Sequence, residues 1–388
     1  MLHKSKINTS CNPMTKSSRN QFIATAVFIV LAIAMFFISR NEAASEWLTR
    51  HVYFNWAKIV GPIFNYVEFD VFEVSAFIWA AILLALLIFA IYYFVHKNNE
   101  LGIRLIASIC LIISMFSAIY VSTVSIMYNR EKLDVYEVEE VMDKDEVLDA
   151  AVRYFLDFHS VASQQQFTEY GATICPYTDE ELIKKIQEEY DRQLTSDYYC
   201  SYTATPKKVA SSYLMSAFSI AGITFGTTVE PGYNYQMPMH NKCITIAHEL
   251  AHTKGVMRED DANELAYYIL LNSQDSYLRY VGYLYTYGYI NNALILVNAG
   301  FVLDIPACAK MDRFISSEFW SIKGTLSNLG ETINSWYLKS NSQSGTGSYV
   351  SQSDYSEEVV ENEEGEEEII FTVNSFSHVQ NMIFGLYQ

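Results

Sequence analysis

The residues of this sequence that are best suited to chemistry lie in the segment ITIAHELAHTKG, residues 244–255. His248 and His252 are four residues apart, so on a helix both imidazoles would lie on one face and could bind one metal ion. Glu249 directly follows the first histidine, where it can take a proton from a zinc-activated water. The pattern predicts a catalytic zinc site, and small neighbours such as Ala247 favour it over a helix that holds these residues by chance.

A catalytic zinc ion needs a third protein ligand and one open position. The metzincin pattern would place a histidine three residues after Gly255, but Arg258 stands there. Glu259 follows, and Asn263 comes one helical turn later, an arrangement in which the carboxylate binds the metal and the amide orients a ligand histidine. This resembles the gluzincin pattern, with Asn263 in place of the usual aspartate, and it predicts Glu259 as the third ligand. The acids could instead merely favour a helix start. Asp261 is the next choice as third ligand, and if it does not bind the metal we expect it beside the residues that do. Asp260 and Glu264 are further competing ligands.

Three uncharged apolar segments early in the chain predict transmembrane helices, because a hydrocarbon core of about 30 Å is crossed by about 20 apolar residues. Three such apolar segments within the first third of the chain make buried core helices of a soluble protein a poor explanation. The first could be a cleaved signal peptide, but its apolar run is too long and a polar leader precedes it. We therefore expect a cytoplasmic leader at 1–21 and a three-span anchor at 22–128. The predicted spans are residues 22–39, 74–95 and 105–128.

Lysines and arginines predict the orientation of this anchor. The leader contains both types and no acidic residue, and the short turn between the second and third spans contains Lys97 and Arg104. By the positive-inside rule both segments are cytoplasmic. Three crossings then place everything after Tyr128 outside the cytoplasm. There Cys175 and Cys200 could form a disulfide, although free buried thiols are equally compatible with the sequence.

The composition fits a membrane anchor joined to a soluble domain, since 51% of the 388 residues are hydrophobic. The formal net charge of −18 argues against nucleic acid as a partner. We expect a mainly helical domain with a small β-sheet at 129–340, a flexible Ser/Gly-rich and acidic insertion at 341–370, and a C-terminal segment at 371–388 that docks on the domain. The segment ITFGTTVE, residues 223–230, predicts an edge strand that could pair with an extended peptide.

The three spans, followed by PKKVASSYLMSAFSIAGITFGTTVEPGYN and ITIAHELAHTKGVMREDDANELAYY, resemble an uncharacterised bacterial membrane family. That family is catalogued as a domain of unknown function and is regarded as zincin-like. It usually has a glutamate where Asp261 stands, so the shorter side chain here favours Glu259 as the ligand. The resemblance implies a zinc metallopeptidase and names no substrate.

The residues and the resemblance together predict a membrane-anchored, mainly α-helical protein with three N-terminal transmembrane helices and a zincin-like domain. We expect a gluzincin-type zinc metallopeptidase of the bacterial cytoplasmic membrane that hydrolyses a peptide or protein substrate outside the cytoplasm. His248, His252 and Glu259 would bind zinc, and Glu249 would be the general base. A tyrosine of residues 277–289 could stabilise the oxyanion. The alternatives are a non-catalytic extracytoplasmic binding module and a zinc hydrolase acting on cell-wall amides.

Overall fold

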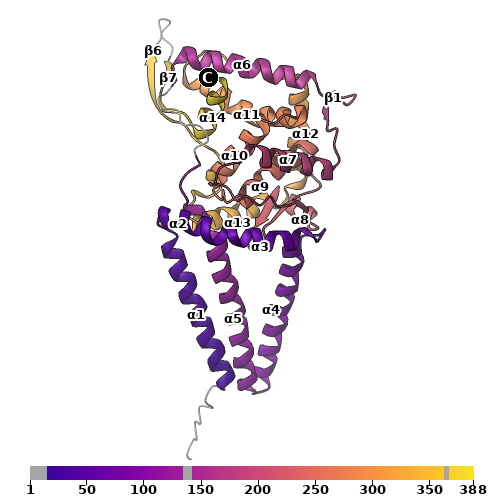
Figure 1. The fold of residues 1–388 in the computed structure, drawn as a ribbon, viewed down its shortest axis with the longest axis vertical. Coiled ribbons are helices and arrows are strands. Elements are labelled where there is room, and N and C mark those ends of the chain that lie inside the picture. The colour runs from indigo at the N-terminus through magenta and orange to yellow at the C-terminus, as the bar shows by residue number, and fades with distance from the viewer. Residues whose placement is uncertain (1–14, 134–141, 362–366) are drawn as a thin grey trace, which may run out of the picture.

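Three long helices form one end of the molecule, and the remaining elements form a domain at the other end (Figure 1). The computed structural model describes residues 15–133, 142–361 and 367–388, so most of the predicted leader lies outside the described residues. The long helices are α1 (Lys16–Ile38), α4 (Val71–Val95) and α5 (Asn99–Thr123), and a short 3₁₀ helix (Ser125–Asn129) continues α5. All three are long and apolar enough to cross a membrane.

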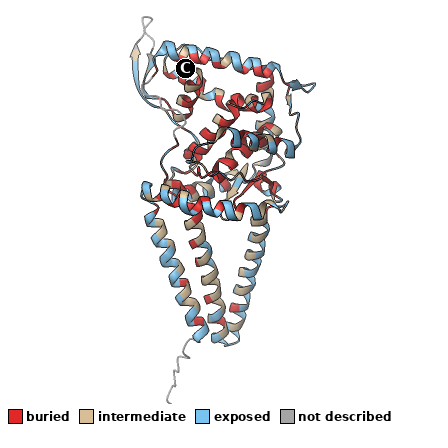
Figure 2. Ribbon diagram, in the orientation of Figure 1, coloured by how far each residue is buried: buried red, intermediate tan, exposed pale blue. Residues whose placement is uncertain are grey.

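The predicted spans are therefore confirmed as candidate membrane-spanning helices, but each helix begins several residues earlier than predicted. The extra first turns are polar and are opened by side-chain caps, since Thr15, Asp70 and Asn98 each accept a hydrogen bond from the backbone N–H three residues on. Few residues of these helices are buried, whereas red buried segments fill the domain in Figure 2. Large apolar side chains on the helix surfaces suit contact with lipid.

The segment between the first two spans is helical, although the sequence predicted only a loop there. It contains α2 (Glu42–Leu48), a π-helical turn (Thr49–Tyr53) and α3 (Phe54–Asn65). These helices lie across the ends of the long helices, at the foot of the domain (Figure 1). They share a small core with the end of α5 and with the domain.

The main core of the domain is built by helices, as predicted. The helix α7 (Asp179–Gln193) opens with a capping box formed by Thr178 and Glu181, a pair whose spacing in the sequence is typical of a helix start. The helices that contribute most of this core are α6 (Lys144–Ser163), α7, α9 (Met239–Thr253), α10 (Glu259–Leu271), α11 (Ser276–Leu296) and α14 (His378–Tyr387). The remaining helices are α8 (Ser212–Ala217), α12 (Ala307–Lys323) and α13 (Ser327–Ser340).

The small sheet beside α9 differs from the predicted single strand over 223–230. It contains β3 (Lys207–Lys208), β4 (Gly222–Phe225) and β5 (Glu230–Tyr233) in the order β3-β5-β4. The strand β4 pairs antiparallel with β5, so the predicted strand is a hairpin that turns after Phe225. Val229 has a positive φ of 57°, which an extended strand does not allow. Pro231 and Gly232, a pair of residues that is common in turns, lie inside β5.

The segment predicted as a flexible insertion over 341–370 is folded wherever the structure describes it. It contains a 3₁₀ helix (Gly345–Tyr349) and the strand β6 (Asp354–Glu361), which pairs antiparallel with β7 (Glu367–Ser375). The β-branched pair Val359 and Ile369 lies in register across these strands, which explains why this charged stretch adopts β-structure. A further short pair consists of β1 (Gln166–Phe167) and β2 (Thr173–Ile174).

The C-terminal segment docks on the domain through α14, whose side chains Val379, Met382 and Phe384 are buried in the main core. Cys175 and Cys200 are free thiols, so no disulfide joins them. Cys200 is buried in the core at the foot of the domain, whereas Cys175 packs against the main core. This separation explains why the possible disulfide does not form.

Candidate metal centre

Two helices joined by a tight turn position the candidate metal ligands. His248 and His252 lie on α9, and Glu259 is the first residue of α10. Gly255 has a φ of 95°, a conformation that favours glycine, and it allows the chain to reverse directly after α9. The close packing of α9 against α10 then brings the first residue of the second helix beside the last turns of the first.

The three predicted ligands form one cluster in which all ligand atoms lie within 4.8 Å of one another. Glu259 Oε2 lies 3.2 Å from His248 Nε2 and 3.7 Å from His252 Nε2. The side chains of His252 and Glu259 are each 6% exposed, and that of His248 is 12% exposed. The cluster is therefore buried, with His248 as its most accessible member. It could hold a metal ion, and it is the only such group among the described residues.

Hydrogen bonds from other groups determine which nitrogen of each imidazole carries the proton. Asn263 Nδ2 donates to the carbonyl of Tyr349 at 2.9 Å, which leaves Asn263 Oδ1 to accept from His248 Nδ1 at 2.8 Å. His252 Nδ1 donates to the carbonyl of Val256 at 2.9 Å. A carbonyl oxygen can only accept, so both histidines carry their proton on Nδ1. Both Nε2 atoms are then free to accept.

Three acceptor atoms therefore face one another in a buried place. Burial lowers the pKa of both imidazoles, that of His252 to about 4, so both are neutral at neutral pH. Burial, with a contribution from the charge of the neighbouring Asp260, raises the pKa of Glu259 to about 7, although His252 acts in the opposite direction. Two imidazole nitrogens and one carboxylate oxygen are a common ligand set for a transition metal. A bound cation would compensate the charge and engage all three lone pairs.

Glu249 is directed toward the small sheet and is not part of the ligand cluster. The hydroxyl of Thr224 on β4 donates to Glu249 Oε2 at 2.6 Å. A Cβ atom at Gly222 would lie 2.7 Å from Glu249 Cγ, so a larger residue there would displace this side chain. Burial raises the pKa of Glu249 to about 7, which suits a group that exchanges protons near neutral pH.

Asp261, the predicted alternative ligand, is directed away from the cluster. Its Oδ2 forms an ion pair with Arg258 at 2.7 Å and accepts from the backbone N–H of Leu133 at 3.3 Å. Asp260 and Glu264 are also outside the cluster. Asp261 lies two positions after Glu259 on α10, so its side chain leaves the helix in a different direction from that of the ligand.

Tyr349 is a neighbour of the centre that the sequence did not indicate. Its ring centroid lies 6.4 Å from that of His248, and its backbone carbonyl holds Asn263. Burial and then the charge of Glu259 raise the pKa of Tyr349, so the phenol keeps its proton at neutral pH. It lies in the segment that was expected to be flexible. Tyr277, Tyr280 and Tyr283, from the tyrosine-rich helix that was expected to supply such a group, are buried in the main core instead.

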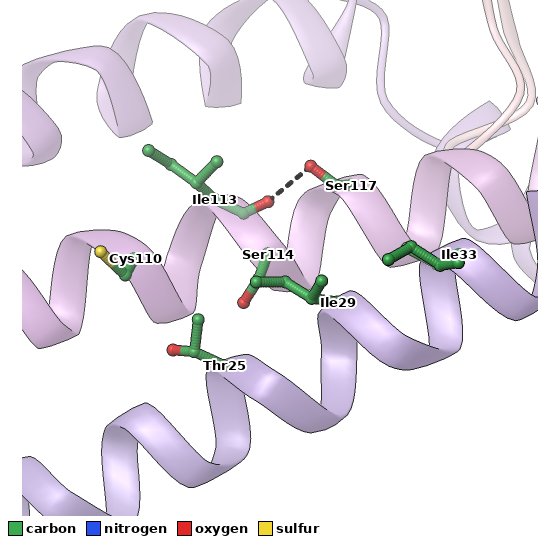
Figure 3. A pocket seen from close by; sticks show the side chains of 8 residues that line it. Thr25, Ile29, Ile33, Cys110, Ile113, Ser114 and Ser117 are labelled. Atoms are coloured by element: carbon green, nitrogen blue, oxygen red, sulfur yellow. Dashed lines mark hydrogen bonds between the residues drawn. The ribbon is translucent and has the colours of Figure 1, made fainter.

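A separate hollow of about 390 Å³ lies between α1 and α5 and is shown in Figure 3. Its lining is apolar apart from small side chains, and Ser117 there donates to the carbonyl of Ile113 at 2.9 Å. The lining residues are Thr25, Ile29, Ala32, Ile33, Cys110, Ile113, Ser114 and Ser117. All lie within candidate membrane spans, and Cys110 is the only one of them whose side chain titrates or commonly binds metal, so the lining offers no cluster of such groups.

Comparison with known proteins identifies a family and no individual relative. No curated protein matches the chain, and no solved structure matches it. One family does match, from the end of α2 to the start of β6, a region that includes two candidate spans and the whole candidate metal centre. Its description is "Protein of unknown function (DUF3810)", and because its model matches residues 48–355, the chain belongs to this family.

Proposed function

We propose that this protein is a membrane-anchored zinc metallopeptidase of gluzincin type with a zincin-like catalytic domain. The observation that carries the proposal is the convergence of His248 Nε2, His252 Nε2 and Glu259 Oε2 in a buried place, where no lysine or arginine among the described residues forms an ion pair with Glu259. Two imidazoles and a carboxylate favour zinc over calcium or magnesium, which prefer oxygen ligands. The adjacent carboxylate of Glu249 favours a catalytic role over a structural one.

Each residue has a defined task in this proposal. A zinc ion held by His248, His252 and Glu259 would supply Lewis acidity toward a peptide carbonyl and toward water. Glu249 takes the proton of the attacking water and returns it to the leaving amine. The hydroxyl of Thr224 holds one oxygen of Glu249 in place and leaves the other to receive the proton. Asn263 and the carbonyl of Val256 keep the two imidazoles in the tautomer that the metal requires.

The strand β4 favours a peptide as substrate. It lies at the edge of its three-stranded sheet in the described structure, and it carries Thr224, which contacts Glu249. An extended peptide can pair with such an edge through its backbone groups. This arrangement supports a peptidase over an enzyme that hydrolyses cell-wall amides. A non-catalytic binding module would not need Glu249 to be held at this place by Thr224.

The arrangement of basic residues favours a domain outside the cytoplasm. The start of α1 and the turn between α4 and α5 lie at the end of the molecule that is far from the domain (Figure 1). The first carries Lys16 and Arg19, and the second is flanked by Lys97 and Arg104. By the positive-inside rule that end is cytoplasmic. The proposed site is therefore on the extracytoplasmic side of a bacterial cytoplasmic membrane.

The proposal is tested by peptide hydrolysis with the purified full-length chain in detergent after loading with zinc. Products from a mixed peptide library are identified by mass spectrometry for the natural chain and for Glu249→Gln. We expect the variant to bind zinc and to hydrolyse the same peptides about 10²- to 10⁴-fold more slowly. Glu318→Gln, at an exposed position of α12, is the matched control and should retain full activity. Equal activity in Glu249→Gln would refute the mechanism.

A further inference from the structure

The helix α3 has apolar residues on two opposite sides. Phe54, Ala57 and Gly61 are buried in the core at the foot of the domain. Ile59 and Ile63 are 68% and 60% exposed, although they are large and apolar. The exposed residues follow one another at spacings of three and four and include the half-exposed Trp56, so they form a stripe along one side of the helix.

The helix α13 repeats this arrangement. Gly330 and Leu338 are buried against the rest of the domain. Leu329, Ile333 and Trp336 are 50%, 56% and 74% exposed and again follow spacings of four and three. An isolated exposed apolar residue needs no explanation, but two aligned stripes that each include a tryptophan indicate a surface that contacts something other than water.

Both helices lie at the level where the candidate membrane spans end. Between the candidate spans α1 and α4, the chain passes through α2, the π-helical turn and then α3, so α3 lies between two candidate spans in the sequence. The end of α13 is bonded to the end of α5, because Asn341 Nδ2 donates to the hydroxyl of Tyr120 at 2.8 Å and Tyr128 donates to the hydroxyl of Tyr337 at 3.2 Å. Figure 1 shows α3 and α13 together across the foot of the domain.

We propose that the exposed stripes of α3 and α13 lie in the interfacial layer of the same lipid bilayer that α1, α4 and α5 would cross. Amphipathic helices bind at the boundary of headgroups and acyl chains, and tryptophan is enriched at that depth. The bilayer is selected as the partner because α3 lies only a few residues before the candidate span α4 and α13 is hydrogen-bonded to the end of the candidate span α5.

This placement puts the candidate metal centre close to the membrane surface. Asn334, on α13, donates to the hydroxyl of Tyr349 at 3.1 Å, and the ring of Tyr349 lies beside that of His248. The 3₁₀ helix that ends at Tyr349 and the helix α13 therefore connect the centre to the proposed lipid contact. A cavity of about 650 Å³ beside the start of α10 is lined by Arg40, which follows the first span, and by Asp260, which follows the ligand Glu259.

The proposal is tested by the depth of individual tryptophans in the full chain, reconstituted in phosphatidylcholine vesicles with or without brominated acyl chains. Four of the five tryptophans are replaced by phenylalanine, so that Trp336 or Trp56 alone remains. Trp79, which is half-buried within the candidate span α4, serves as the reference at the depth of the acyl chains. The aqueous reference is Tyr170→Trp in a background without natural tryptophans, because Tyr170 is 74% exposed at the turn between β1 and β2.

We expect brominated lipid to quench Trp336 and Trp56 by a fraction similar to that of Trp79, with little quenching by acrylamide. The residue at position 170 should show the reverse. Acrylamide quenching of Trp336 and Trp56 equal to that at position 170, without quenching by lipid, would overturn the proposal. Trp336→Phe in the otherwise natural chain gives a second test, because it should remove a lipid-quenchable component of the fluorescence. Neither measurement depends on peptidase activity.

Discussion

Two buried groups of charged side chains differ in how their charge is compensated. Lys207 and Glu230 form the first group, where the sheet meets the membrane helices, and their side chains are 4% and 2% exposed. Lys207 Nζ donates to Glu230 Oε1 at 2.6 Å and to two backbone carbonyls. Glu230 also accepts from the backbone N–H groups of Val71 and Phe72 at 3.0 Å, at the start of α4. Both charges of the Lys207–Glu230 pair therefore have partners within the protein, whereas the neighbouring buried Asp70 has one oxygen without a hydrogen-bond partner.

The candidate metal centre is the second group, and among the described residues no lysine or arginine forms an ion pair with its carboxylate. Glu259 faces the acceptor nitrogens of His248 and His252. Burying an uncompensated charge is costly, so a buried carboxylate among acceptors indicates that a cation or a proton is supplied from outside the chain. The comparison distinguishes a structural cluster from a candidate binding site by the completeness of its hydrogen bonds and ion pairs. Glu230, at the end of the predicted strand, belongs to the structural cluster.

The largest expected effect is a loss of stability when the buried ion pair of Lys207 and Glu230 is broken. Lys207→Met leaves the charge of Glu230 buried without its partner, which should lower the free energy of unfolding by about 3–5 kcal/mol. Denaturant unfolding of the full chain in detergent measures this change. The adjacent Lys208 is 48% exposed in its ion pairs with Asp179 and Glu180, so Lys208→Met should cost at most about 1 kcal/mol. Equal losses in both variants would contradict the distinction.

A smaller effect is expected when the support of one ligand is removed. Asn263→Ala deletes the acceptor that holds the proton of His248 on Nδ1, which should weaken zinc binding by about 10- to 100-fold. Competition with a chromophoric chelator measures this affinity. The matched control is Asn272→Ala, which removes an amide of the same type at the other end of α10, far from the centre. This variant should bind zinc as tightly as the natural chain does. An unchanged zinc affinity in Asn263→Ala would argue against a role of Asn263 in orienting His248.

The smallest effect on metal binding is expected at Asp261. Its carboxylate is engaged by Arg258 and by the backbone of Leu133, so Asp261→Asn should leave the zinc affinity unchanged in the same competition assay. A loss as large as that in Asn263→Ala would mean that Asp261 takes part in the centre. The centre would then have a different ligand set from the one that its present geometry indicates.

The parts of the fold that depend on local sequence could be predicted. The three spans follow from long uncharged runs, and the cap of α7 follows from residues within one helical turn. The grouping of His248, His252 and Glu259 was also accessible, because all three lie within a dozen residues and one tight turn joins their helices. Spacing on a helix and the conformational freedom of Gly255 are local properties of the chain.

The parts that depend on contacts between distant segments could not be predicted. Tyr349 reaches the centre from a segment about eighty residues beyond α10, and its composition is typical of a flexible linker. The stripes on α3 and α13 were overlooked because each helix is apolar on two sides, so the simple contrast between a buried and a polar face is weak. Thr224 and Gly222 contact Glu249 only because the hairpin of β4 and β5 packs on α9.

The central claim is most directly tested by the zinc content of the purified full-length chain, measured by elemental analysis after loading and desalting. The natural chain is compared with His248→Ala, Glu259→Ala and Asp261→Ala. We predict about one zinc ion per chain in the natural protein and in Asp261→Ala, and none in the other two variants. Absence of zinc from the natural chain, or its retention in Glu259→Ala, would contradict the proposed centre.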